Sequence, residues 1–246
     1  MNLTDKNFWI KYWENKTNLN IKVKPNYILS EILKKITSKN KVKTAIELGG
    51  YPGYYAIYLK KYLNIESTLL DYVVIKKQIE SLLKINELNV NSVKLIEADL
   101  FNYDIKTKYD LVLSVGLIEH FENTSEIIKM HTDFLNEKGV LFINIPNFKG
   151  LNGLIQKYFD LENYKKHNID CMNIEKLHSI CEQLGLKNIE VRYYGSFMIW
   201  LENFDEKSFF FKKAFNIIWL FFKVIFKLIP IETRFFSPYI NITATK

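Results

Sequence analysis

Acidic residues and glycines that could hold a polar ligand follow three short apolar runs of the chain. The first run, at 44–48, contains Glu47 and is followed by glycines at 49, 50 and 53, whereas later runs end at Asp71 and Asp99. Glycines let the backbone turn tightly and approach a ligand, and a helix that starts behind them offers unpaired N–H groups. A carboxylate at the end of a strand can accept hydrogen bonds from ribose hydroxyls. These positions therefore predict a binding site for a ligand with a ribose and charged groups.

Two of the four histidines stand where an acceptor hydroxyl could be deprotonated. His120 directly follows Glu119 behind the fourth apolar run, and His167 lies in the loop after the fifth. Histidine is the commonest general base because its ordinary pKa lies near neutrality. Each has a structural alternative, since His120 can tie its loop to the next helix and His167 can cap a helix or bond a backbone carbonyl. His131 and His178 fall within amphipathic helices, where packing or surface roles are typical.

The apolar runs alternate with segments of helical periodicity. Strands are expected at 44–48, 67–71, 92–99, 109–115, 140–147, 187–195 and 237–246, and helices at 54–63, 73–88, 125–139 and 173–185. This alternation predicts an α/β fold: a doubly wound, Rossmann-like, seven-stranded sheet that is mostly parallel, with an antiparallel C-terminal strand and helices on both faces. Ligands of such sheets bind outside the carboxyl ends of the strands.

The order and spacing of these motifs resemble those of the class I S-adenosylmethionine-dependent methyltransferases. The resemblance is carried by ELGGYPG after the first strand, Asp71 at the end of the second, EADLF at the third and YDLVLSVGLIEHF at the fourth. The stretches PNFKGLN at 146–152 and HNIDCM at 167–172 are most similar to bacterial small-molecule and saccharide O-methyltransferases. One position departs from the family, because Tyr51 stands where the loop usually has glycine. Its side chain must point away from the donor or partly over it.

The resemblance implies that the chain is an enzyme that uses S-adenosylmethionine, releases S-adenosylhomocysteine and needs no metal. The expected donor-binding residues are Glu47, Gly49, Gly50, Tyr51, Gly53, Asp71, Tyr72, Asp99, Leu100, Ser114, Val115 and Tyr12, and the expected catalytic bases are His120 and His167. Glu47 would receive the donor's ammonium, or else cap the loop backbone. Asp71 would bind the ribose, and Asp99 would bind the adenine amino group or cap a helix. Glu119 and His120 could contribute to a metal site, but the further carboxylates that such a site needs are missing from their loop.

Composition limits the partners of the chain. The net charge is +7, yet only two of the basic residues are arginines, Arg192 and Arg234. Nucleic-acid readers rely on arginine for bidentate contacts, so we expect no nucleic-acid partner. The acceptor that the resemblance implies is a small molecule or saccharide. Cys171 and Cys181 match no metal-ligand spacing and are expected to be reduced and buried. The N-terminal segment lacks the apolar stretch of a secretory signal, which predicts a cytoplasmic protein.

A single domain is expected over 1–246, with additions at two places. An N-terminal cap helix at about 1–35 carries Phe8, Trp9, Tyr12 and Trp13, which could close over the donor or simply pack. An aromatic helical insertion at about 203–235 separates the last two strands. Its core at 208–230 is apolar around a narrow lysine stripe, and its longest uncharged part, 214–222, is too short to span a bilayer. We favour a buried lid over the acceptor site; the alternative is an interfacial helix at the inner membrane face.

The predicted function is O-methylation of a small molecule or saccharide, such as a cell-surface glycan precursor in polysaccharide biosynthesis. N-methylation of nucleic acid is the first alternative, although SVGL stands where the adenine and exocyclic-amine modifiers carry an N/D-P-P-Y/F loop. A non-catalytic protein that keeps the donor fold for binding or assembly is the second.

Overall fold

The structure is a computed structural model that describes residues 3–246. Over this range seven strands form one sheet in the order β3-β2-β1-β4-β5-β7-β6. The strands are β1 (Thr44–Leu48), β2 (Glu66–Asp71), β3 (Val93–Glu97), β4 (Tyr109–Val115), β5 (Leu135–Pro146), β6 (Lys187–Tyr194) and β7 (Tyr239–Thr245). β7 runs antiparallel to both of its neighbours, β5 and β6, and the other pairs are parallel. The predicted α/β sheet with an antiparallel C-terminal strand is confirmed.

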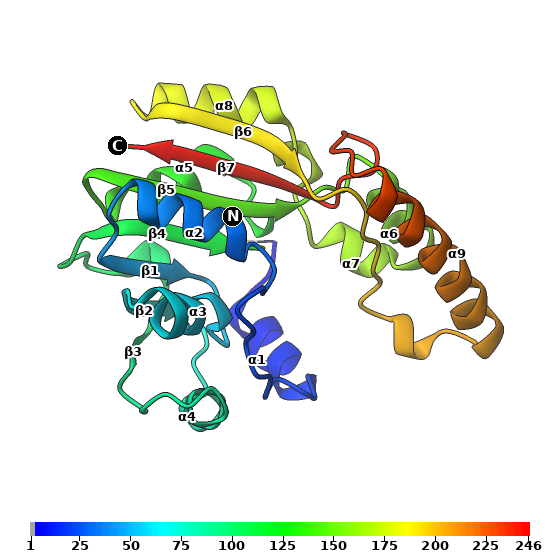
Figure 1. Ribbon diagram of the computed structural model, residues 1–246, viewed down its shortest axis with the longest axis horizontal. Coiled ribbons are helices and arrows are strands. Elements are labelled where there is room, and N and C mark those ends of the chain that lie inside the picture. The colour runs from blue at the N-terminus through cyan, green and yellow to red at the C-terminus, as the bar shows by residue number, and fades with distance from the viewer. Residues whose placement is uncertain (1–2) are drawn as a thin grey trace.

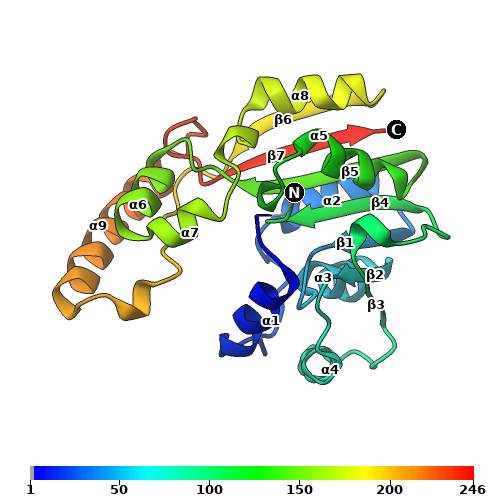
Figure 2. The ribbon, with the colours of Figure 1, turned by 180° about the vertical axis from the view of Figure 1, so that it is seen from behind.

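Helices cover both faces of this sheet. They are α1 (Lys6–Asn15), α2 (Ser30–Lys39), α3 (Tyr54–Leu63), α4 (Lys76–Ile85), α5 (Thr124–Asp133), α6 (Leu151–Phe159), α7 (Leu161–Lys165), α8 (Ile174–Gln183) and α9 (Phe209–Leu228). Short 3-10 turns lie at η1 (Leu100–Asn102), η2 (Ile118–His120), η3 (Ile169–Cys171) and η4 (Phe204–Glu206). Figure 1 shows α2 and α3 in front of the sheet, and Figure 2 shows α5 and α8 on the opposite face. The additions α1, α6, α7 and α9 gather toward the carboxyl ends of the parallel strands.

Alternation along the central strands divides the core into two layers. In β4, Leu111 and Leu113 pack into one buried cluster while Val112 packs into the other. Successive side chains of a strand point to opposite faces, so a strand buried on both sides reads as a continuous apolar run. Each fully buried leucine or valine contributes about 1.5–3 kcal/mol relative to an exposed one. The strand ends, and the loops behind them, are held in place from both faces.

Several local features follow from side chains near element ends. Asp110, the second residue of β4, accepts hydrogen bonds from the backbone N–H groups of Lys43 and Thr44 and from Asn136, so it ties the starts of β1 and β5 together far from the carboxyl ends of the strands. Asn173 caps α8 by accepting from the N–H of Lys176. Cys171 and Cys181 are free and buried, as expected.

The expected helix at 125–139 is too long. α5 ends at Asp133, and β5 begins at Leu135, which pairs with Tyr109 ahead of a register shift. Asn136 lies in this extension, where its side-chain amide donates to Asp110 at 2.9 Å. Asn136 makes this tertiary contact as part of a strand, although the periodicity of the local sequence favours one more helical turn. Helices α6 and α7 were not expected, and the region at about 1–35 holds α1 and the start of α2 instead of one cap helix.

The aromatic helix α9 lies between β6 and β7 in the chain, as expected, but the expectation of deep burial is wrong. Phe226 is its one buried residue, whereas Phe209, Phe210 and Leu228 are 72%, 81% and 77% exposed. Figures 1 and 2 show α9 beside α6, away from the sheet. Ring contacts join it to Phe159 and Phe197. Among the described residues, none forms a helix with the length and apolarity needed to cross a membrane.

Candidate functional site

Two adjoining cavities open at the carboxyl ends of β1 to β4. They adjoin each other, because the side chains of Trp9, Trp13 and His120 and the backbone of Gly49 and Gly116 line both. Of the predicted residues, the first cavity is lined by Gly49, Asp71, Tyr72, Asp99, Leu100 and His120. The second is lined by Tyr12, Glu47, Gly49, Gly50, Tyr51, Val115, His120 and His167. The fold thus brings most of the predicted site residues to one place.

The loop after β1 is shaped by glycine and tied to the end of β2. Gly49 has φ +61°, and a Cβ there would overlap the side chain of Leu117, which also lines the first cavity. The N–H of Tyr51 donates to Oδ2 of Asp71 at 2.9 Å. The Tyr51 ring is buried and meets Trp13 edge to face at 5.0 Å. Tyr51 therefore points toward α1, where it lines the second cavity and not the first.

Glu47 is both a helix cap and a wall of the second cavity. Its Oε2 accepts the N–H of Ala56, in the first turn of α3, at 2.7 Å. The residue is 2% exposed, and this burial raises the pKa of the carboxyl to about 8, with a further contribution from the charge of Asp71. Glu47 therefore has the capping role that was its structural alternative. Its side chain also lines the second cavity, so binding of the donor's ammonium stays a prediction.

The two carboxylates at the ends of β2 and β3 are held by backbone N–H groups. Asp71 accepts from Tyr51 through Oδ2 and from Val73 through Oδ1, and burial raises its pKa to about 6. Asp99 caps η1 by accepting from the N–H of Phe101 and the side-chain amide of Asn102. Each carboxylate oxygen has two lone pairs, so these bonds still leave acceptor capacity toward the first cavity.

Two predicted donor residues lie outside both cavities. The hydroxyl of Ser114 is fully buried and lies 2.8 Å from Nε2 of His131. This pair joins β4 to α5, which accounts for the burial of His131. Gly53, with φ +93°, is the residue before α3, and a Cβ there would lie 3.1 Å from Leu69. Its role in the structure is to allow the turn into that helix.

The two candidate bases, His120 and His167, lie against each other, and a backbone carbonyl group orients each ring. Nδ1 of His120 lies 3.0 Å from the carbonyl oxygen of Lys166, and Nδ1 of His167 lies 2.7 Å from that of Asn163. Because a carbonyl only accepts, each Nδ1 must carry the proton, which leaves the lone pair on Nε2. Burial, with the neighbouring His167, lowers the pKa of His120 to about 3, and burial also lowers that of His167. The ring of His120 is therefore neutral at physiological pH, and the lowered pKa of His167 favours its neutral form.

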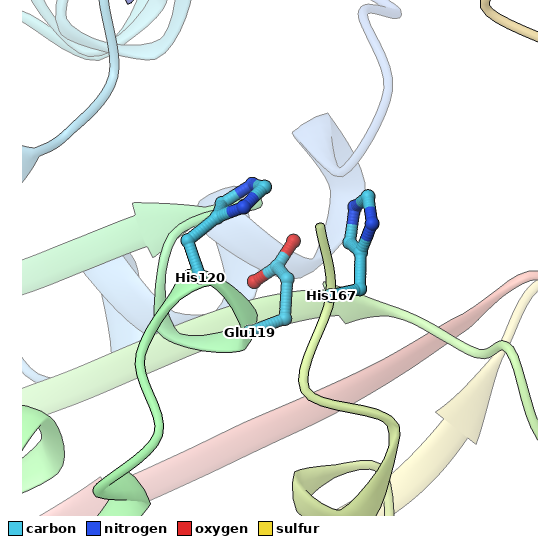
Figure 3. Close-up of side chains that lie close together, drawn as sticks. All are labelled: Glu119, His120 and His167. Atoms are coloured by element: carbon cyan, nitrogen blue, oxygen red, sulfur yellow. The ribbon is translucent and has the colours of Figure 1, made fainter. Parts of the chain in front are cut away.

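Glu119 completes a cluster with these histidines. It is 1% exposed, its Oε2 has no hydrogen-bond partner in the described range, and burial raises its pKa to about 8. One potential ligand atom from each of Glu119, His120 and His167 lies within 4.8 Å of the others. Figure 3 shows the carboxylate between the two rings, on side chains from η2 and the segment after α7. Only the fold brings His167 to the Glu119–His120 pair.

Helix α1 covers both cavities with aromatic side chains. Trp9 and Trp13 line each of them, and the Trp9 ring meets His120 edge to face at 5.1 Å. The Tyr12 hydroxyl donates to Oε2 of Glu202 at 3.2 Å, and burial is the main cause that raises its pKa to about 12. The N-terminal aromatic segment is thus part of the cavity wall.

Several residues of the second cavity were not predicted. Among them are Phe148, Asn163, Lys166, Trp200, Glu202 and Tyr239. Phe148 and Lys166 lie within or beside the stretches at 146–152 and 167–172, so those motifs could have indicated them. Trp200 and Glu202 follow β6 in a segment without a local pattern. Their position depends on contacts such as the bond from the Glu202 N–H to Asp160 at 2.9 Å.

Comparisons with known proteins agree with this architecture. The model of a family described as "Methyltransferase domain" matches residues 22–191, more than half of the chain. "Probable (S)-tetrahydroprotoberberine N-methyltransferase 2" from Papaver bracteatum is 30% identical over 112 residues, 45% of this chain and 31% of that protein. (S)-coclaurine N-methyltransferase from Papaver somniferum is 32% identical over 60 residues, 24% of this chain and 17% of that protein. The matches thus span about a third or less of these curated relatives.

Solved structures share the fold. A SAM-dependent methyltransferase from Archaeoglobus fulgidus superposes with a TM-score of 0.56 at 18% identity, covering 89% of this chain and 93% of that one. Phosphoethanolamine N-methyltransferase 2 from Haemonchus contortus, solved in complex with S-adenosyl-L-methionine, gives a TM-score of 0.54 at 15% identity and covers 83% and 48%.

Proposed function

We propose that this chain, which belongs to the methyltransferase domain family, transfers a methyl group from S-adenosylmethionine to a hydroxyl oxygen of a small molecule. The observation that carries this proposal is the position of His120, which lines both cavities. A side chain in that place can reach an acceptor in the second cavity next to a donor in the first. The family match supports the donor, and the geometry of the cluster supports activation of an acceptor.

The residues around the first cavity fit an adenosine-containing donor. Asp71 places a carboxylate in the wall for the ribose, and Asp99 with Leu100 offers an acceptor and apolar surface for adenine. Gly49 and Gly50 keep the turn free of side chains where the cavities meet, beside Glu47 for an ammonium group. The donor, when bound, supplies an electrophilic methyl group whose bond to sulfur breaks, with its electron pair left on sulfur, as the bond to the acceptor oxygen forms.

The side chains of the second cavity have defined tasks in this proposal. Neutral His120 keeps the Nε2 lone pair free to take the acceptor's proton, because its Nδ1–H is bonded to the carbonyl of Lys166. Trp9, packed edge to face on the His120 ring, restricts its rotation and shields it from water. His167 lies at a ring distance of 4.8 Å and is the alternative base. Proton removal by a positioned base contributes about 10²- to 10⁴-fold in rate.

The second cavity suits a hydroxylated acceptor such as a saccharide. Trp200 and Tyr239 present aromatic surface, their rings stacked at 5.8 Å, while Asn144 and Glu202 add polar groups. Aromatic surface packs against apolar faces, and the polar groups can hydrogen-bond the hydroxyls that fix its orientation. A glycan precursor is the acceptor class that we favour. The alkaloid N-methyltransferase names of the curated relatives make an amine the competing acceptor.

The test begins with calorimetric titration of the intact chain with S-adenosylhomocysteine, for which we expect one binding site. The chain is then incubated with S-adenosylmethionine and separate panels of nucleotide sugars, simple phenols and isoquinoline amines. Mass spectrometry identifies the product that has gained one methyl group. No binding of S-adenosylhomocysteine by folded protein would refute the donor assignment. Methylation of amines alone would refute the oxygen acceptor, and donor binding without any methylated product would favour the scaffold alternative.

We also propose that α9 lies on an anionic membrane surface at the inner face of the membrane. The helix contains Lys212, Lys213, Lys223 and Lys227 and no acidic residue. Its exposed apolar side chains are Phe209, Phe210, Ile217, Ile218, Leu220, Phe221, Val224, Ile225 and Leu228. Lys223 Nζ lies 4.2 Å from the centre of the Trp219 ring. An apolar surface with lysines beside it is typical of helices that enter the headgroup region of anionic bilayers.

Vesicle sedimentation tests this surface. The full chain should bind phosphatidylglycerol-containing vesicles and bind pure phosphatidylcholine vesicles less tightly. The double variant Phe210→Ser with Phe221→Ser should lose most of this binding. Val90→Ser, which removes a 54% exposed apolar side chain ahead of β3, should not change it. The contrary result is a chain that does not bind vesicles but self-associates in solution, with a larger mass that the double variant abolishes. The partner of α9 would then be a second copy of the chain, and not a membrane.

A further inference from the structure

We propose that Glu119, His120 and His167 bind one divalent transition-metal ion in the wall of the second cavity. One potential ligand atom from each residue lies within 4.8 Å of the other two. All three residues line the second cavity. Figure 3 shows that their side chains converge from two chain segments. The site deepens the proposed function, because an ion there would face the acceptor.

The orientation of both histidines suits metal ligation. Nδ1 of His120 and Nδ1 of His167 are each bonded to a backbone carbonyl, of Lys166 and Asn163 respectively. Metal-ligating histidines usually donate their other ring N–H to a carbonyl or carboxylate, which fixes the ring and makes the free nitrogen more basic. Both rings of the cluster already have this second hydrogen bond. Their free Nε2 atoms are the ligands that we assign.

Glu119 supplies an independent observation. Its Oε2 is buried, and no side chain, backbone group or other atom of the described chain forms a hydrogen bond with it. A buried carboxylate oxygen without a partner is costly, because desolvation is not repaid. An ion bound between Glu119 and the two rings would pair this oxygen. The nearby N–H of Asn168 does not bind Oε2; it donates to the backbone carbonyl of Glu119 at 2.6 Å.

The donor set selects the class of ion. Two imidazoles and one carboxylate suit borderline ions such as Zn²⁺, Fe²⁺ and Co²⁺, whereas Mg²⁺ and Ca²⁺ prefer oxygen ligands. Three protein ligands also leave a coordination position free, which is the arrangement of catalytic sites; structural zinc sites usually have four. The free position would face the second cavity. We therefore assign to the ion a role in binding a ligand in the second cavity.

An occupied site would change how the acceptor is activated. The Nε2 lone pair of His120 would then be a metal ligand, and the ion would replace it in activating the acceptor. A hydroxyl coordinated to a divalent ion releases its proton to water at a lower pH than a free hydroxyl does. This consequence rests on the proposed function, whereas binding of the ion does not.

Cobalt titration of the intact chain tests the site without using methyl transfer. Chelator-treated protein without a polyhistidine tag is titrated with Co²⁺ and followed by visible absorption and equilibrium dialysis. We expect one Co²⁺ per chain, displacement by Zn²⁺ and no displacement by an equal concentration of Mg²⁺. Glu119→Gln and His167→Gln should each weaken Co²⁺ binding by at least about 10-fold, since even supporting residues of metal sites are worth about that much.

A matched control comes from the surface of α8. His178 and Glu182 form an exposed pair at 3.5 Å that could bind metal adventitiously. His178→Gln should leave Co²⁺ binding unchanged, and all variants should retain the wild-type unfolding midpoint within a few degrees. Absence of stoichiometric Co²⁺ binding, or binding that survives both cluster variants and is lost in His178→Gln, overturns the proposal. Protein that binds S-adenosylhomocysteine but no Co²⁺ refutes this site and keeps the donor assignment. Co²⁺ binding without S-adenosylhomocysteine binding supports the site and refutes the donor.

Discussion

The two cavities are built in different ways. The predicted donor-binding residues of the first cavity lie at or just beyond the ends of β1, β2 and β3, and the backbone of the sheet itself positions them. Asp71, for example, is the last residue of β2 and accepts two backbone N–H groups. The second cavity also has strand-end residues such as Glu47 and Val115 in its wall, but segments around α6, α7 and the stretch after β6 complete it. Trp200 and Glu202 belong to that last stretch.

This difference separates the residues that the sheet positions from those that the loops and added helices position. A site at strand ends inherits its geometry from a sheet that is buried on both faces, so short motifs suffice to specify it. A site formed by loops and added helices depends on contacts between segments that are distant in sequence. We therefore expect changes at the strand ends, including Glu47, to affect donor affinity, and changes in the loops and added helices to affect turnover.

The largest effect is expected for His120→Gln. Glutamine retains a hydrogen-bonding side chain of similar reach but cannot act as a base at neutral pH. Turnover with the identified acceptor should fall by about 10²- to 10⁴-fold, while the affinity for S-adenosylhomocysteine stays within a few-fold of wild type. Steady-state kinetics and calorimetry measure the two quantities. A parallel fall in donor affinity would contradict the division between the cavities.

Asp71→Asn should have the next largest effect, on donor affinity. Hydrogen bonds to a charged group are worth about 1.5–3 kcal/mol each, so we expect affinity for S-adenosylhomocysteine to fall by about 100-fold. Asp110→Asn is the matched control, because Asp110 also accepts two backbone N–H groups but lies at the opposite end of its strand. The control should lose stability and keep donor affinity. Equal affinity in the two variants would remove Asp71 from the donor site.

Gly49→Ala should give an intermediate loss of affinity of about 10-fold. Gly49 and Gly185 both have positive φ, +61° and +75°, so alanine at either position costs about 1–3 kcal/mol of backbone strain. Only at Gly49 would the new Cβ displace Leu117, which lines the first cavity, whereas nothing lies within 4 Å at Gly185. Urea unfolding should therefore show similar destabilisation in both variants, with weaker S-adenosylhomocysteine binding in Gly49→Ala alone. Similar affinities would show that Leu117 moves without narrowing the cavity.

The smallest effect concerns pH. Burial raises the pKa of Glu47 to about 8 and that of Asp71 to about 6, above the ordinary values of 4.5 and 3.8 for these carboxyl groups. Between the ordinary and the raised pKa of each carboxyl group, the folded chain therefore binds more protons than the unfolded chain. The contribution of this proton binding to the free energy of unfolding is fully present below the pKa of the unfolded chain. It is lost as the pH rises through the pKa of the folded chain. The ligand's ammonium favours ionised Glu47, so affinity for S-adenosylhomocysteine should rise a few-fold from pH 6 to pH 8.

Urea unfolding and calorimetry at both pH values measure this coupling. Glu47→Gln should remove most of the rise in affinity and part of the decline in stability. A rise that persists unchanged in Glu47→Gln would assign the coupling to another group.

Sequence patterns predicted elements well where burial and local capping agree. The runs at 44–48 and 109–115 became β1 and β4 with the expected bounds, and Asn173 caps α8. Prediction failed at 134–139 because a strand pairing and the bond from Asn136 to Asp110 outweigh helical periodicity. It also failed for α9, since an apolar face predicts burial but does not reveal whether the chain provides a surface to bury it.

The sequence by itself determined the family, the sheet and the motifs of the first cavity, because a strand end and the turn behind it are local features. Only the tertiary structure joined His167 to Glu119 and His120, covered both cavities with α1 and turned α9 outward. These arrangements depend on the packing of segments far apart in the chain, such as the bond from the Asn168 N–H to the Glu119 carbonyl. No local pattern encodes such contacts, since each exists only after the sheet has brought its partners together.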